Sequence, residues 1–214
     1  MNAIVLDTET TNSLDCPFVY DLGWAVIDLD THEVKATRSF AIAEIFLNRE
    51  LMESAYFAEK IPSYWDEIHA GTRKLVKWRT ARTALLEDCA DYQVGEIYAH
   101  NARFDYLSCQ LTQRYLTKSR WRWFFPYGVK MCDTLKMARK AFGADESYTE
   151  FCTENEYKTA RGQMRFTAEV LYRFLTQDVT FEEEHKGLDD VLIEKEILLE
   201  CRRRGVHEGS LWTE

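Results

Sequence analysis

The segment VLDTETT, residues 5–11, places two carboxylates two positions apart directly after an apolar run. Residues 3–6 have the apolar character of a buried strand. Because side chains alternate along a strand, Asp7 and Glu9 point to one face and Thr8 to the other. Two like charges this close repel each other, so each acid is driven toward protonation unless a cation lies between them. A bound divalent cation would remove the repulsion, although Asp-x-Glu alone is a weak pattern that also suits two hydrated acids.

Two further stretches contain acids beside a histidine. The stretch AHNARFDYL, residues 99–107, follows a predicted strand and puts Asp105 in the first turn of a helix, where the helix dipole favours an acid whatever its function. The stretch EEEHKGLDDVLIEKEILLE, residues 182–200, predicts an amphipathic helix with Asp190 near its start and His185 just before it. Helical periodicity places Asp190 roughly opposite the apolar stripe and predicts that it is exposed. The same His-x4-Asp spacing occurs in both stretches, so the spacing alone identifies no site.

The elements that must position these acids form a mixed α/β pattern. Apolar runs predict strands at residues 19–27 and 34–42, joined by a polar turn into an antiparallel hairpin. Further short strands are predicted at residues 96–99 and 129–132, and helices at 63–92 with a break near Gly71, from 102 to about 115, at 134–142, at 165–177 and at 187–204. This order predicts a mixed central sheet flanked by helices, compatible with an RNase H-like core. The first strand would be central and would carry Asp7 and Glu9.

The size and composition of the chain suit one cytoplasmic domain. With 214 residues and 46% hydrophobic residues, we expect a single domain over residues 1–204 and a C-terminal tail over residues 205–214. The six cysteines include no Cys-x-x-Cys pair, which is typical of reduced thiols in the cytoplasm. No apolar run approaches the roughly 20 residues of a membrane span, and we expect no signal peptide, because the first predicted strand begins at residue 3. We therefore expect no membrane partner, and the sequence contains no signal for an oligomeric state.

The net charge of −9 limits the kind of nucleic-acid binding that the chain can support. It argues against broad nonspecific binding, because the phosphate backbone repels an acidic surface. It permits a local site whose acids are neutralised by metal ions.

The three acidic stretches, taken in order, resemble a known family. Asp-x-Glu on a first strand, HNARFD in mid-chain and His-x4-Asp at a C-terminal helix resemble the DEDD superfamily of 3′-to-5′ exonucleases, in its DnaQ-like branch with a catalytic histidine. The resemblance extends over almost the whole chain, from residue 4 to about residue 200, and includes MCDTLKMAR, residues 131–139. Many members have Gly where this chain has Asn12, and Asn tolerates left-handed backbone geometry better than other non-glycine residues. The resemblance implies an RNase H-like exonuclease fold, the metal ligands Asp7, Glu9, Asp105 and Asp190, and His185 as general base.

Hydrolysis of a phosphodiester explains why these residue types are needed. Two Mg²⁺ or Mn²⁺ ions about 4 Å apart would activate a water molecule and stabilise the leaving 3′-oxygen, and both metals prefer oxygen ligands. Asp7 would bridge both ions while Glu9 binds one of them. Asp190 would complete the shell of the first ion, and Asp105 would act on the second directly or through water. A neutral His185 would remove the proton from the attacking water.

An exonuclease must also hold an unstacked 3′ end. The polar candidates for contact with the terminal sugar are Thr10, Thr11, Asn12 and Asn101, of which Asn101 can equally cap a helix. The candidates for stacking or wedging the terminal bases are Phe104, Leu14, Phe18 and Tyr106, and core packing is the simpler interpretation of Phe104.

Three basic clusters can guide the strand to the site, or can simply be solvated helix faces. They are Arg73, Lys74, Lys77, Arg79 and Arg82; Lys118, Arg120 and Arg122 interleaved with Trp121 and Trp123; and Arg202, Arg203 and Arg204. The alternation of arginine and aromatic residues in the second cluster makes it the most suggestive.

The sequence thus predicts a metal-dependent 3′-to-5′ exonuclease that releases nucleoside 5′-monophosphates from single-stranded DNA or RNA 3′ ends, with DNA slightly favoured. The alternatives are an exoribonuclease, or a hydrolase of short oligonucleotides, with the same two-metal site. A non-catalytic nucleic-acid-binding module would predict a broken set of acids, whereas all five positions are intact.

Overall fold

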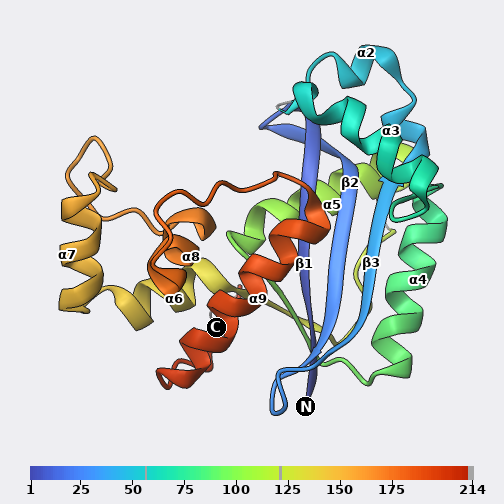
Figure 1. Cartoon of the computed structure of the whole chain (residues 1–214). Coiled ribbons are helices and arrows are strands. Elements are labelled where there is room, and N and C mark those ends of the chain that lie inside the picture. Colours follow the sequence, from blue (N-terminus) through green and yellow to red (C-terminus); the bar gives the residue numbers. More distant parts are fainter. Residues whose placement is uncertain (56, 121, 212–214) are drawn as a thin grey trace.

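A mixed sheet forms the centre of the molecule, as Figure 1 shows. The computed structural model describes residues 1–55, 57–120 and 122–211. The strands of this sheet lie in the order β4 (Lys74–Val76), β3 (Val34–Ile42), β2 (Cys16–Asp28), β1 (Asn2–Ser13), β5 (Glu96–Ala99) and β6 (Lys130–Asp133). The pairs β1–β2 and β2–β3 are antiparallel, whereas β5 is parallel to β1, β6 to β5 and β4 to β3. The predicted mixed α/β, RNase H-like fold is confirmed, with β1 at the centre of the sheet.

Helices cover both faces of the sheet (Figure 1). One face is covered by α4 (Trp78–Asp91) and α5 (Ala102–Thr117). The other is covered by α9 (Gly187–Arg203), against which α6 (Thr134–Phe142) and α8 (Ala168–Thr176) pack, and α7 (Glu146–Glu154) lies further out on that side, away from the sheet. Four short helices connect β3 to β4: α1 (Ala43–Phe46), α2 (Arg49–Met52), η1 (Ala58–Lys60) and α3 (Ile61–Ala70). Within the described residues, no helix is both long enough and apolar enough to cross a membrane.

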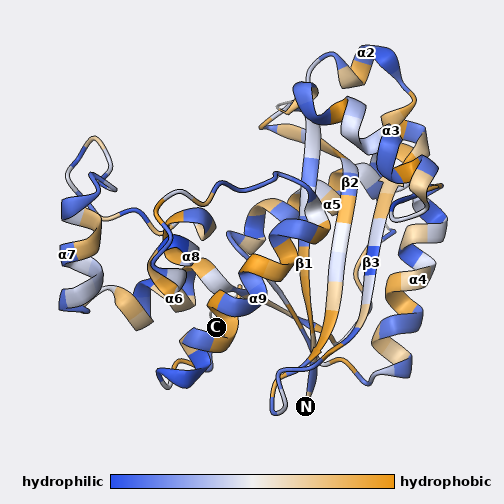
Figure 2. Ribbon diagram, viewed as in Figure 1, coloured by the Kyte–Doolittle hydropathy of each residue, from blue (hydrophilic) through white to orange (hydrophobic). Residues whose placement is uncertain are grey.

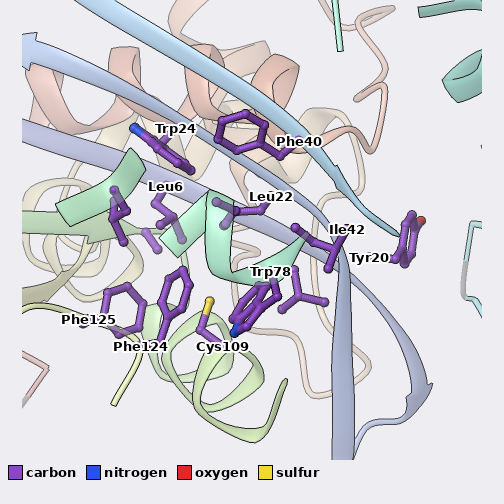
Figure 3. Close-up of a cluster of buried hydrophobic side chains, with 14 of the residues drawn as sticks. Leu6, Tyr20, Leu22, Trp24, Phe40, Ile42, Trp78, Cys109, Phe124 and Phe125 are labelled. Carbon is purple, nitrogen blue, oxygen red and sulfur yellow. The ribbon is translucent and has the colours of Figure 1, made fainter. Parts of the chain in front are cut away.

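Strand β1 contributes alternate side chains to two hydrophobic cores. Ile4 and Leu6 belong to the core on the side of α4 and α5, and Figure 3 shows Leu6 there among large buried side chains such as Trp78. Ala3 and Val5 belong to the core on the side of α6 to α9. Figure 2 shows much of β2 and the lower part of β1 as hydrophobic, and the loop between α8 and α9 as largely hydrophilic. The alternation continues beyond the cores, so that the acids of β1 face α9.

The predicted helix over residues 63–92 is two helices with a strand between them. The break at Gly71 is confirmed, because this residue ends α3 with a left-handed φ of 79°. Strand β4 follows and pairs with β3. A three-residue strand has too few residues to show a period of its own, so its pairing depends on the tertiary structure. Helix α7 is a second element that periodicity did not predict, and Asp145 caps it by accepting hydrogen bonds from two backbone N–H groups.

Helix α5 forms as predicted, but its polar face lies against the sheet. Leu107 and Tyr115 of the apolar spacing are exposed, whereas Ser108 and Thr112 are buried. Thr112 Oγ1 accepts a hydrogen bond from the N–H of Val19 at 2.9 Å. Val19 lies beside an irregularity in the β1–β2 register immediately after Glu9. The polar face of the helix therefore provides a hydrogen-bond partner for a backbone group of the distorted strand, which an apolar face would leave unpaired.

Candidate active site

Acids from β1 and α9 line one cavity together with the predicted histidine. Asp7, Glu9, His185 and Asp190 all line this cavity, whose volume is about 1080 Å³. One ligand atom from each of Glu9, His185 and Asp190 lies within 4.8 Å of the others, close enough for the three to hold one ion. Four of the five predicted catalytic residues therefore meet at a single place. Asp190 is buried rather than exposed, which corrects the prediction from helical periodicity.

Two glycines allow α9 to approach the sheet closely enough for this meeting. A Cβ atom added to Gly23 of β2 would lie 2.3 Å from the carbonyl carbon of Gly187. A Cβ atom added to Gly187 would lie 2.8 Å from the backbone nitrogen of Gly23 and 3.3 Å from the backbone oxygen of Asp7. Only residues without a Cβ atom fit this contact. The first turn of α9 therefore rests on β2, and it carries Asp190 to the side of β1 that Asp7 faces.

Asp105, the remaining predicted acid, lies beside the cluster without lining the cavity. It is 2% exposed, and Thr8 Oγ1 donates a hydrogen bond to its Oδ1 at 2.8 Å. Burial raises the pKa of Asp105 to about 7, and the hydrogen bonds from Thr8 oppose that rise. The Asp105 charge in turn raises the pKa of Asp7. The structure thus places Asp105 within electrostatic reach of Asp7, on the α5 side of the strand.

The electrostatics of the cluster favour protonation of its acids in the absence of a cation. Burial is the largest cause, and it raises the pKa of Glu9 to about 9 and that of Asp190 to about 8. The pKa of Asp7 is raised by burial and then by the charges of Glu194, Asp105, Glu9 and Asp190. The acids therefore repel one another in a buried environment.

Two carboxylate oxygens of the cluster lack hydrogen-bond partners. Asp7 Oδ2 and Asp190 Oδ1 are buried, and neither has a partner among the described residues. Buried polar atoms are normally paired, so each needs an explanation. Mg²⁺ and Mn²⁺ prefer oxygen ligands and would compensate the negative charge. The residues present therefore fit a divalent cation.

The side chain of His185 is held by an aromatic residue from a distant part of the chain. Its ring stacks on Phe57 with centroids 4.0 Å apart and planes 8° from parallel. Its backbone is left-handed, with a φ of 51°. Burial lowers the pKa of His185 below its ordinary value, so the imidazole is neutral near pH 7 and can accept a proton.

A buried ion pair anchors the segment that carries His185. Asp21 of β2 is fully buried, forms an ion pair with Arg73 and accepts a hydrogen bond from the N–H of Gly187 at 2.9 Å. Arg73 also pairs with Glu67, which in turn pairs with Lys186. The two residues after His185 are therefore tied to β2 and α3. Arg73 is buried in this network, which corrects its predicted place on an exposed basic track.

The predicted sugar-contact residues have different environments. Thr11 is 1% exposed, and its hydroxyl contacts Leu51 O and the Ser54 hydroxyl, so its side chain is occupied by the protein, and a substrate contact through its backbone stays a prediction. Thr10 is half-buried in β1, beside Glu9. Asn12 has a φ of 72°, which agrees with the left-handed geometry considered for this position.

Asn101 lines the cavity and begins α5 with a left-handed φ of 66°. Its side chain makes no capping hydrogen bond, which leaves the amide available to a ligand. Phe104 is half-buried and belongs to neither hydrophobic core. Phe18, in contrast, is buried in a hydrophobic core and stacks on Tyr115 with ring centroids 4.4 Å apart.

The other residues predicted to wedge the terminal bases, and the predicted basic clusters, also lie in different environments. Leu14 is 82% exposed on the β1–β2 turn, whereas Tyr106 stacks on Phe125. Arg79, Arg82 and Arg122 line a second cavity of about 710 Å³, whose lining contains none of the predicted catalytic acids. The residues Arg203 and Arg204 pair with acids, and Trp121 lies outside the described residues.

Three further residues of the cavity were not predicted. Glu194 is 3% exposed and accepts a hydrogen bond from the N–H of His100 at 3.1 Å, and Glu183 precedes His185 by two positions. Glu194 follows Asp190 by four positions, which puts both on one side of a helix. This spacing was the sequence signal that could have identified Glu194 as a site residue. His100 joins the end of β5 to Thr134 Oγ1 and to Phe166 O.

Several solved structures share this fold. The nuclease domain of 3′hExo, a DEDDh family member bound to rAMP, matches with a TM-score of 0.68 and 12% identity, over 100% of this chain and 97% of that one. A 3′-exonuclease in 3′-end specific recognition of histone mRNA stem-loop matches with a TM-score of 0.68 and 10% identity, over 98% and 66%. E. coli Exonuclease I in complex with a dA16 oligonucleotide matches with a TM-score of 0.54 and 13% identity, over 94% and 41%. No protein-family model and no curated protein sequence matches the chain.

The chain therefore has an RNase H-like fold, which it shares with the nuclease domain of 3′hExo, a DEDDh family member. At these identities the likeness concerns the fold.

Proposed function

We propose that this protein is a metal-dependent 3′-to-5′ exonuclease that hydrolyses the terminal phosphodiester bond of single strands and releases nucleoside 5′-monophosphates. The main support is the meeting of Glu9, His185 and Asp190 within 4.8 Å, beside two buried carboxylate oxygens without partners. That cluster lies on a fold shared with 3′-exonucleases. The reacting phosphate is an anion that acids alone would repel, so an acid cluster of this kind suits phosphoryl chemistry only when bound cations neutralise the acids.

Each residue has a role that its position supports. Asp7, Glu9 and Asp190 would hold divalent metal, with Asp105 acting on it directly or through water. When bound, two such ions would supply charge stabilisation and a nucleophile at neutral pH. His185 would accept the proton from the attacking water, for which its lowered pKa keeps it neutral. Asn101, on the cavity wall, would contact the terminal nucleotide. So would Thr10, which follows Glu9 in the sequence, and Phe104, which precedes Asp105.

End-labelled substrates test this proposal. A 5′-labelled single strand with Mg²⁺ or Mn²⁺ should give a descending ladder and free nucleoside monophosphates, and EDTA should stop the reaction. A 3′-phosphate-blocked strand should resist cleavage, and duplex ends should react more slowly, because opening the terminal pair costs a few kcal/mol. Cleavage of circular single strands at a comparable rate would contradict an exonuclease and indicate an endonuclease.

We place DNA slightly ahead of RNA as the substrate, and the alternatives are an exoribonuclease or an oligonucleotide-degrading hydrolase with the same site. The similar structures include one with a DNA oligonucleotide and one with an RNA stem-loop, so both polymers belong in the test. DNA and RNA strands of identical sequence, at lengths of two, five and twelve nucleotides, separate the three possibilities. A preference for the dinucleotide over the longer strands would favour the oligonucleotide hydrolase.

A further inference from the structure

The cavity that contains the acid cluster has a second, basic part of its wall. Arg139 of α6 lines it, and so do Lys158 and Arg165 from the segment between α7 and α8. The cavity volume of about 1080 Å³ slightly exceeds the roughly 300–1,000 Å³ typical of small-molecule sites. Acids from β1 and α9 and cations from α6 and the α7–α8 segment therefore share one space, large enough for more than a metal centre.

The basic segment is an ordered hairpin attached to the active site. Lys158 and Met164 form an antiparallel bridge, and the N–H of Thr159 donates to Gln163 O at 2.7 Å. Gly162 makes the turn with a left-handed φ of 76°. Beyond the hairpin, Phe166 O lies 2.7 Å from His100 Nε2, at the end of β5. These contacts hold the hairpin in place beside the acids, so its cations are preorganised for a ligand.

The cations of this wall are not neutralised by the protein. Residues 158–166 contain three basic residues and no acid, in a chain with a net charge of −9. No carboxylate of the described residues lies within 4.0 Å of the charged groups of Arg139, Lys158 or Arg165, whereas Arg203 and Arg204 have such partners. Unpaired cations inside a concave site favour an anionic ligand.

We propose that Arg139, Lys158 and Arg165 bind backbone phosphates of the nucleic-acid strand while its 3′ end lies at the acid cluster. This inference rests on the proposed function and adds the surface that holds the strand. Arginine and lysine are the usual partners of phosphate, and each neutralised phosphate releases counterions. The division of charge matches a strand in the cavity, with metal-held acids at the scissile bond and cations at phosphates further along.

Matched charge variants test the proposal. The double substitution Arg139→Gln/Lys158→Gln removes two cations that line the cavity. Lys140→Gln/Arg161→Gln removes two cations from the same helix and the same hairpin that do not line it, with an identical change in net charge. Binding of a fluorescent twelve-nucleotide single strand is measured by anisotropy in Ca²⁺ across a range of salt concentrations. Hydrolysis of p-nitrophenyl thymidine 5′-monophosphate, which has no strand, reports on the metal site.

At low salt the cavity variant should bind the strand at least about tenfold more weakly than the wild type. Its slope of log affinity against log salt should be smaller in magnitude by about 1.4, because each of the two lost phosphate contacts contributes about 0.7 on single strands. The control variant should keep the wild-type slope. The control variant should hydrolyse the p-nitrophenyl ester at the wild-type rate, and the cavity variant should lose much less of this hydrolysis than of its strand binding. Equal slopes for the two variants, or equal loss of ester hydrolysis and strand binding in the cavity variant, would overturn the proposal. A wild-type protein that binds with these slopes but releases no nucleotide would contradict the proposed function and leave the phosphate site intact.

Discussion

The substitution Asp190→Asn tests whether the acid cluster destabilises the metal-free protein. The folded structure raises the pKa of Asp190 to about 8, mainly by burial and then by neighbouring acids, while the unfolded chain keeps it near the ordinary value of about 3.9. Above about pH 4 the unfolded state releases a proton that the folded state retains, so stability falls as pH rises until about pH 8. At pH 7.5 the full difference corresponds to about 5 kcal/mol, at about 1.36 kcal/mol per pH unit. Because neighbouring carboxyls titrate together and share this cost, we expect about 2–4 kcal/mol.

Asparagine has the shape of aspartate and cannot ionise, so the variant escapes this penalty. In EDTA at pH 7.5, its melting temperature should exceed that of the wild type by roughly 4–16 °C, since about 1 kcal/mol shifts a chain of this size by about 2–4 °C. At pH 5 the difference should shrink. Addition of Mg²⁺ or Mn²⁺ should then raise the melting temperature of the wild type, as measured by calorimetry, much more than that of the variant.

The adjacent exposed acid provides the control, because Asp189→Asn should keep the wild-type response to metal. A lower melting temperature for Asp190→Asn in EDTA at pH 7.5, or an undiminished response of this variant to metal, would refute the reasoning. Loss of the metal response in Asp189→Asn instead would show that the neighbouring acid is the ligand.

Three other substitutions have defined outcomes. His185→Ala should lower turnover about 100- to 10,000-fold with a smaller effect on KM. The wild-type rate should rise with pH to a plateau, with a midpoint below the ordinary histidine pKa of about 6.5, because burial lowers the pKa of His185. A flat wild-type profile from about pH 5.5 to 8, together with an active His185→Ala variant, would exclude the histidine. Phe57→Leu should lower turnover about two- to tenfold, since aromatic stacking contributes about 0.5–1.5 kcal/mol, and unchanged kinetics would exclude a positioning role. Arg73→Met should destabilise the fold by about 3–5 kcal/mol in urea, because it leaves Asp21 buried without its cation, and adding Asp21→Asn should recover part of that loss if the pairing is the cause.

Local patterns predicted the parts of the fold that depend on local structure. The hairpin of β2 and β3 has a polar turn between two apolar runs, and the alternation along β1 sends Asp7 and Glu9 to one face. Helix α7 and strand β4 lack such patterns. The short strand exists because β3 offers it a pairing edge, and no residue within it encodes that partner.

The misjudged site residues share a physical cause, which is burial by distant elements. Helix α9 lies between the sheet and the helices α6 and α8, so a wheel with one apolar stripe wrongly predicts Asp190 to be exposed. Arg73 looks like part of a basic surface run, yet its partner Asp21 lies 52 positions earlier in the chain. Thr11 is similarly occupied by contacts to α2. In each case the partner is brought close by the tertiary fold, which a local pattern does not describe.

The contact between Gly23 and Gly187 makes the proposed metal site depend on residues that have no functional group. Mg²⁺ requires near-ideal geometry, with ligands at about 2.0–2.1 Å, so small errors in the position of a carboxylate matter. A single methyl group on either glycine would act as a spacer between α9 and the sheet, because its carbon would lie less than 3 Å from backbone atoms of the other segment. The last acid would then be withdrawn from Asp7 with every ligand still present in the sequence. The catalytic motifs alone would not reveal this change, so under the proposed function an intact set of acids is not sufficient, and the two glycines are required as well.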